Sequence, residues 1–165
     1  RGFVAGVKQE QFGDPTPCSQ WNVQALLEHI NQATGYLCTF LTGTQPEIPS
    51  AMSALEAYDR VTRAALAGAN TPVVLDKVFK TPMGDLTGAK MVALLFSDNL
   101  IHGWDLAKAT GQEATLDPKL VEASYALLEP DIKGSRAAGA FGPEVSVSTD
   151  ASLQVKFLGM TGRKS

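Results

Sequence analysis

The stretch 87–111 is the feature that most constrains the fold of this chain. It reads TGAKMVALLFSDNLIHGWDLAKATG, and its apolar residues are spaced as one face of a long helix. Thr87 is the expected N-cap, and Gly111 suits the position just after the last turn. The same face carries Asp98, His102 and Asp105. Polar groups on a core-facing stripe are costly unless something pairs with them, so this helix needs partners inside the fold.

Other segments have the same helical spacing of apolar residues. The expected helices run over residues 22–43, 53–69, 87–111, 117–128 and about 152–160. Asn22 is a plausible N-cap, and Gly43 ends the helix that it opens. Ser53 and Glu56 form the S-x-x-E pattern of a capping box, and Pro118 occupies the first position of its helix. These start and stop signals place the helix boundaries.

The segments between these helices are less regular. Residues 1–12 have loose helical spacing. Residues 73–86 hold a cluster of β-branched residues with a turn at Pro82 and Gly84, which predicts a short extended connection or small hairpin. Residues 129–149 are rich in Gly, Ala, Ser and Pro and read as a long loop, which is often mobile or functional.

Together these elements predict an all-α fold. The chain has 165 residues, of which 44% are hydrophobic and 19% charged, and this suits one globular domain over 1–165. We expect an antiparallel four-helix bundle with an additional short helix and long crossover loops at 70–86 and 129–151. The chain starts at RGFVAGVKQEQF without a methionine, which indicates that its N-terminus is incomplete.

Charge and hydropathy exclude several classes of partner. The net charge is −3 and the 14 basic residues are scattered, so we expect no nucleic acid. No apolar run approaches the roughly 18–20 residues of a membrane span, and no signal peptide is visible, so we expect no membrane. Cys18 and Cys38 do not make a disulfide framework, and a reduced cytoplasmic setting follows. Bundles of this kind often pair through helix faces, which suggests a homodimer.

The two histidines of the chain suggest a metal site. Asp98 and His102 are four residues apart on one helix face, and His29 lies on another predicted helix. Two imidazoles and one carboxylate suit Zn²⁺, Ni²⁺ or Fe²⁺, and three protein ligands leave a position for water or substrate. An alternative is that Asp98 and His102 form only an intrahelical ion pair, with His29 a lone, partly buried residue. The metal hypothesis makes the sharper prediction.

Three further polar or aromatic positions are weaker candidates. Asp105, one turn beyond His102, either orients an imidazole or caps or pairs with a neighbouring helix, and it is the nearest candidate for a general base. Cys18 precedes His29 by eleven residues, which is roughly 10–16 Å if much of that segment is helical, so we expect no ligand role. Trp21 and Trp104 are interpreted as core residues, with a place in a pocket wall as the alternative.

Three stretches resemble a known family. TPCSQWNVQALLEHI and SDNLIHGWDLAKATGQ are similar to motifs of the metal-binding domain of mycothiol-dependent maleylpyruvate isomerase and the DinB/YfiT-like putative metalloenzymes. AFGPEVSVSTDASLQVKFLGMTGR resembles the C-terminus of a single-domain actinobacterial branch. The resemblance implies an up-down-down-up four-helix bundle that holds zinc or nickel on His29, Asp98 and His102. Relative to the isomerase, we expect this chain to have Asp98 in place of a glutamate and to be without the additional C-terminal domain.

The resemblance and the residues together lead to three functional hypotheses. The first is a metal-dependent transferase or isomerase that uses a low-molecular-weight thiol, with mycothiol as co-substrate, on a small-molecule substrate. The second is a metal-dependent hydrolase, in which the same site activates water. The third is a non-catalytic domain whose site is structural, vestigial or binds a small ligand.

Overall fold

A computed structural model describes residues 1–19, 21–81 and 84–165. Within these residues the chain is mostly helical, with one small two-stranded sheet, in agreement with the expected helical class. The chain divides into two compact units, Arg1–Gln112 and Glu113–Ser165, which are described separately. None of the helices in the described ranges is both long and apolar enough to cross a membrane.

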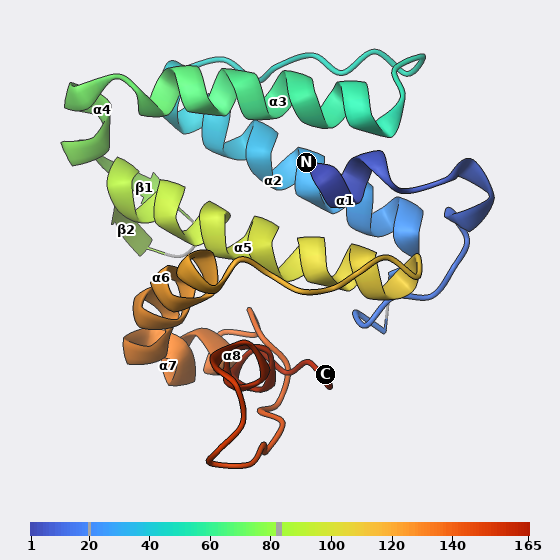
Figure 1. The fold of residues 1–165 in the computed structure, drawn as a ribbon. Helices are drawn as coiled ribbons and strands as arrows, with labels where there is room; N and C mark the ends of the chain where they lie inside the picture. The colour runs from blue at the N-terminus through green and yellow to red at the C-terminus, as the bar shows by residue number, and fades with distance from the viewer. Residues whose placement is uncertain (20, 82–83) are drawn as a thin grey trace. The chain divides into compact units, whose positions relative to one another are not determined.

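The first unit is built on three long helices. Its elements in order are α1 (Gly2–Ala5), η1 (Gln9–Gln11), α2 (Val23–Thr42), α3 (Ala54–Ala69), α4 (Pro72–Asp76), β1 (Val78–Thr81), β2 (Gly84–Thr87) and α5 (Gly88–Ala109). The central helix α2 packs against both α3 and α5, and the short helix α1 packs against α3 and α5 (Figure 1). Residues 1–12, which have only loose helical spacing, form two short helical pieces, α1 and η1.

Side-chain caps set the ends of the long helices where the sequence predicts them. The Asn22 side chain accepts a hydrogen bond from the Ala25 amide at the start of α2, and Gly43 ends that helix with a φ of 77°. The capping box at Ser53 opens α3. Thr87 caps α5 by accepting a hydrogen bond from the amide of Lys90. These predicted boundaries are confirmed.

Two apolar clusters hold the first unit together. One gathers residues of α1, the first half of α2 and the end of α5: Val4, Val23, Leu26, Leu27, Ile30 and Leu106. The other gathers the second half of α2 with α3, β1 and the start of α5: Leu37, Cys38, Leu41, Ala65, Phe79 and Met91. Cys38 is fully buried there, as expected of a small core residue. The two clusters fix α2 against α5, which is the helix pair that carries the histidines.

The connection between α3 and α5 contains more structure than the sequence predicts. Strands β1 and β2 pair antiparallel, with Val78 opposite Thr87, so the expected small hairpin is present. The preceding helix α4 was not predicted, although Pro72 at its first turn is a recognised start signal. The predicted turn includes Pro82, which lies outside the described residues.

The second unit contains α6 (Pro118–Leu128), η2 (Glu129–Asp131), α7 (Ile132–Ala137) and α8 (Leu153–Met160). Helix α6 packs against α8, and both begin and end where predicted. The predicted loop 129–149 is wrong over its first nine residues, which are helical in η2 and α7. Among the small and polar residues of this segment, Ile132 at the start of α7 is apolar and buried, at 7% exposed.

The arrangement as a four-helix bundle stays a prediction. The described part of the first unit holds the long helices α2, α3 and α5, whereas α6 belongs to the second unit. The established feature is that α2 and α5 lie against each other.

Candidate metal centre

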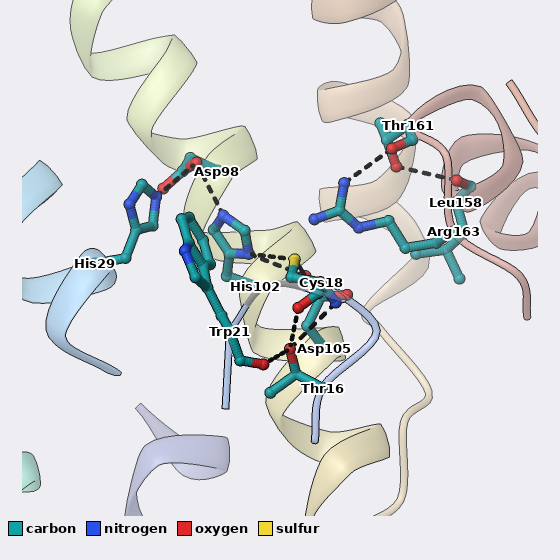
Figure 2. A network of polar contacts seen from close by, with 10 residues as sticks. All are labelled: Thr16, Cys18, Trp21, His29, Asp98, His102, Asp105, Leu158, Thr161 and Arg163. Atoms are coloured by element: carbon teal, nitrogen blue, oxygen red, sulfur yellow. Dashed lines mark hydrogen bonds and ion pairs between the residues drawn. The ribbon is translucent and has the colours of Figure 1, made fainter. Parts of the chain in front are cut away.

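Two helices of the first unit supply three clustered side chains. His29 comes from α2, and Asp98 and His102 come from successive turns of α5 (Figure 2). Oδ1 of Asp98 lies 3.3 Å from Nε2 of His102 and 3.6 Å from Nε2 of His29. Each residue offers a ligand atom, and the three atoms lie within 4.8 Å of one another. The structure therefore brings together the three residues that the sequence singled out, about seventy residues apart.

The atoms of this cluster fit a divalent cation. Nε2 of His29 and Oδ2 of Asp98 are buried and have no hydrogen-bond partner within the described residues. Buried polar atoms without partners are costly, so their occurrence here calls for an explanation. Tetrahedral bonds of about 2.0–2.1 Å place neighbouring ligand atoms ~3.3 Å apart, close to the separations between Asp98 and the imidazoles. A cation on these atoms would satisfy both orphaned groups.

Asp105 holds the His102 ring from the opposite side. Its Oδ2 lies 2.9 Å from Nδ1 of His102, and its side chain is fully buried. A carboxylate only accepts hydrogen bonds, so Nδ1 of His102 donates here and Nε2 is directed toward Asp98 and His29. This arrangement is typical of metal-binding histidines, whose second ring nitrogen is bonded to a carboxylate. Asp105 thus contacts the imidazole of His102, three residues away on the same helix.

The ionisable side chains of the cluster strongly shift the pKa values of one another. Burial opposes ionisation of Asp98, but His102 and His29 outweigh it and hold the pKa of Asp98 well below its usual range. Burial also disfavours charge on His102, but Asp105, Asp98 and Cys18 together raise the pKa of His102 to about 11. The metal-free cluster therefore holds a proton on His102 that a cation must displace before it can bind Nε2.

Comparison with known proteins finds similar proteins whose names state no activity. The chain is 33% identical over 139 residues to a Mycobacterium tuberculosis protein named Uncharacterized protein Rv0738, and the match covers 80% of this chain and 75% of the relative. Uncharacterized protein MT0763, from another strain, matches with the same values. This chain belongs to their family. No family model matches it, and no solved structure matches it significantly.

In this member of the Rv0738 family, Trp21 lies beside both imidazoles. Its ring centroid is 4.4 Å from that of His29 and 5.6 Å from that of His102 (Figure 2). Trp104, by contrast, is 2% exposed and is the core residue that the sequence predicts. Trp21 thus lies at the site, as the pocket-wall alternative predicts, and it also packs against the first apolar cluster. It precedes the α2 N-cap by one residue, and nothing in that position signals contact with α5.

Cys18 lies much closer to the cluster than the sequence predicts. Its Sγ is 4.0 Å from Nδ1 of His102 and donates a hydrogen bond of 3.2 Å to Oδ2 of Asp105. The expected 10–16 Å separation assumed a helical approach to His29, but α2 begins only at Val23. The preceding chain folds back instead, and Pro15 and Asn22 form an isolated antiparallel bridge. Cys18 is thus a neighbour of the site that sequence spacing missed.

Proposed function

We propose that this protein binds a divalent cation on Nε2 of His29, Nε2 of His102 and a carboxylate oxygen of Asp98. The observation that carries the proposal is a pair of buried atoms, His29 Nε2 and Asp98 Oδ2, that have no hydrogen-bond partner among the described residues and lie beside a third ligand. Two nitrogen donors and one oxygen donor suit zinc or nickel better than magnesium or calcium.

The surrounding residues support a binding site with defined geometry. Asp105 holds the tautomer and orientation of His102 through its 2.9 Å contact at Nδ1. Trp21 lies against the His29 ring and limits its rotation. About a third of each of the His29 and Asp98 side chains is exposed, at 33% and 32%, so small molecules can approach the ligands from solvent. The site therefore combines rigid ligands with an accessible side.

We further propose that the site serves a reaction of a small-molecule substrate with a low-molecular-weight thiol such as mycothiol. Three protein ligands leave a coordination position open, and a divalent ion there lowers the pKa of a bound thiol or water. The resemblance of TPCSQWNVQALLEHI and SDNLIHGWDLAKATGQ to the mycothiol-dependent, DinB/YfiT-like proteins supports this choice over hydrolysis. The up-down-down-up bundle of that superfamily is part of the proposal. A cytoplasmic setting is also part of the proposal, because two cysteines in a chain of this size do not make a disulfide framework.

Calorimetric titration of mycothiol into nickel-loaded or zinc-loaded protein tests this proposal. We expect binding to the loaded wild type and none to the metal-free protein. An S-methylated mycothiol has no free thiol to ionise and is the matched ligand control, which we expect to bind at least about tenfold more weakly.

The outcomes separate the parts of the proposal. Equal binding of mycothiol and its S-methylated form would contradict a thiol-binding role for the metal. Hydrolysis of simple ester or amide substrates by the loaded protein, with no affinity for mycothiol, would replace the thiol reaction by hydrolysis and leave the metal site intact.

A further inference from the structure

A second group of ligand atoms lies on the other side of the His102 ring. Sγ of Cys18, Nδ1 of His102 and Oδ2 of Asp105 lie within 4.8 Å of one another. The separations are 3.2 Å for sulfur to oxygen, 4.0 Å for sulfur to nitrogen and 2.9 Å for nitrogen to oxygen. This group shares only His102 with the first cluster. We propose that it is a second cation site, for a thiophilic ion such as Cd²⁺.

The spacing of these atoms is close to that of a metal site with mixed ligands. Zinc bonds of about 2.3 Å to sulfur and 2.0–2.1 Å to nitrogen place the two ligand atoms ~3.5 Å apart in a tetrahedron. The Cys18 and His102 atoms are 4.0 Å apart, so a shift of about half an ångström brings them to that spacing.

The backbone around Cys18 is held in place for this role. The Thr16 hydroxyl oxygen accepts a hydrogen bond from the Cys18 amide at 3.1 Å and donates to the Trp21 carbonyl at 2.8 Å. These bonds close the turn that directs Cys18 toward α5 (Figure 2). His102 and Asp105 are buried, whereas Cys18 is partly exposed, so an ion reaches the group from the cysteine side.

The donor atoms distinguish the two sites by metal preference. The first offers two nitrogens and one oxygen, which favours nickel and zinc, whereas the second includes a thiolate, which favours softer ions. A neutral imidazole has one unprotonated nitrogen with a lone pair for a metal. His102 therefore binds a cation either through Nε2, in the first site, or through Nδ1, in the second. The two sites therefore exclude each other at neutral pH, and the identity of the ion decides which one is occupied.

Cadmium titration followed by ultraviolet absorption tests the inference, because a Cd²⁺–thiolate bond gives a charge-transfer band. We expect the band in the wild type and in His29→Ala, which removes a ligand of the first site only. We expect it to disappear in Cys18→Ser, with Cd²⁺ binding weakened at least about tenfold, while Cys38→Ser keeps it as the matched cysteine control. Loading the wild type with Ni²⁺ first should suppress the band.

A second measurement needs no variant. Mass spectrometry of the wild type after alkylation reports whether Cd²⁺ protects Cys18, and we expect protection that Mg²⁺ does not give. A band that persists in Cys18→Ser, or a Cys18 that alkylates equally fast with and without Cd²⁺, would overturn the second site. Because His29→Ala removes the first site alone, failure of one proposal is distinguishable from failure of the other.

Discussion

Asp105 fixes the ring of His102 at Nδ1, at a distance of 2.9 Å, and so directs Nε2 toward Asp98 and His29. The two residues are three positions apart on α5 and both are buried, at 0% and 7% exposed. One helix turn thus carries both a proposed metal ligand and the group that orients it. The consequences for affinity, proton release and fluorescence can each be measured.

Asp105→Asn should weaken metal binding without removing a proposed ligand of the first site. The amide keeps the volume of the side chain but loses the charge that fixes the His102 tautomer. Loss of such an outer partner lowers metal affinity by about 10–100-fold. Competition with a chromophoric chelator measures the change in Ni²⁺ affinity.

The matched control for this carboxylate is Asp59→Asn. Asp59 lies on α3, pairs with Arg1 at 2.8 Å and belongs to neither group of candidate ligands. We expect its Ni²⁺ affinity to equal that of the wild type. Equal affinities for Asp105→Asn and Asp59→Asn would mean that Asp105 has no positioning role.

Cation binding should release a proton from His102. The pKa of His102 is raised to about 11 in the metal-free protein, so the ring is protonated at pH 7 and must lose a proton to bind through Nε2. Metal affinity should therefore increase with pH. Calorimetric titrations in two buffers of different ionisation enthalpy count the released protons, and buffer-independent heats would contradict this prediction.

The same shift makes the metal-free protein lose stability at high pH. Because the pKa of His102 is higher in the folded protein than its unfolded value of about 6.5, protonation of His102 stabilises the folded state fully below pH ~6.5. This stabilisation is lost as pH rises toward the folded-state pKa. The pKa of Asp98 is lowered in the folded protein, so ionised Asp98 stabilises the folded state at neutral pH. This stabilisation is lost at acid pH, as pH falls below the unfolded value of about 3.9. Urea unfolding should show a lower free energy of unfolding at pH 9 than at pH 6.5, with a flatter dependence in His102→Gln.

Trp21 should report metal binding by its fluorescence. Its ring lies 4.4 Å from His29, so a paramagnetic ion such as Ni²⁺ on that imidazole quenches its emission. We expect saturable quenching in the wild type and loss of most of it in Trp21→Phe, which retains only Trp104. Undiminished quenching in the variant would place the ion near Trp104 instead.

Gly88→Ala should destabilise the first unit. A Cβ at Gly88 would clash with the carbonyl oxygen of Val74, a backbone atom that cannot move aside cheaply. Such overpacking costs about 1–3 kcal/mol. Gly13→Ala is the control, because its Cβ meets nothing within 4 Å, and we expect a change within about 0.5 kcal/mol. Urea denaturation followed by circular dichroism compares the two variants.

Local signals in the sequence predict the helices and the composition of the main cluster. Asn22, Ser53 and Thr87 are caps whose hydrogen bonds form within a few residues, so their effects depend little on the rest of the fold. Asp98 and His102 share a face through helical periodicity alone. The pairing with His29 needed only the further assumption that α2 and α5 are neighbours.

The contacts of the turn before α2 could not be predicted in the same way. Cys18 and Trp21 reach the site because Thr16 closes a turn through three hydrogen bonds, and because the chain folds back over α5. Such a path depends on tertiary contacts, and the extrapolation of helical rise from His29 placed Cys18 too far away. In α7, the small residues around Ile132 carry little helical periodicity, so a packed turn was interpreted as a loop.

The most direct test of the metal site is the nickel content of tag-free protein after chelator treatment, reloading and desalting. The wild type and Cys18→Ser should each retain about one ion per chain, whereas His29→Ala and His102→Ala should retain almost none, because loss of one of three ligands leaves the ion too weakly held. A wild type that retains no nickel, or a His29→Ala variant that retains as much as the wild type, would contradict the proposed centre.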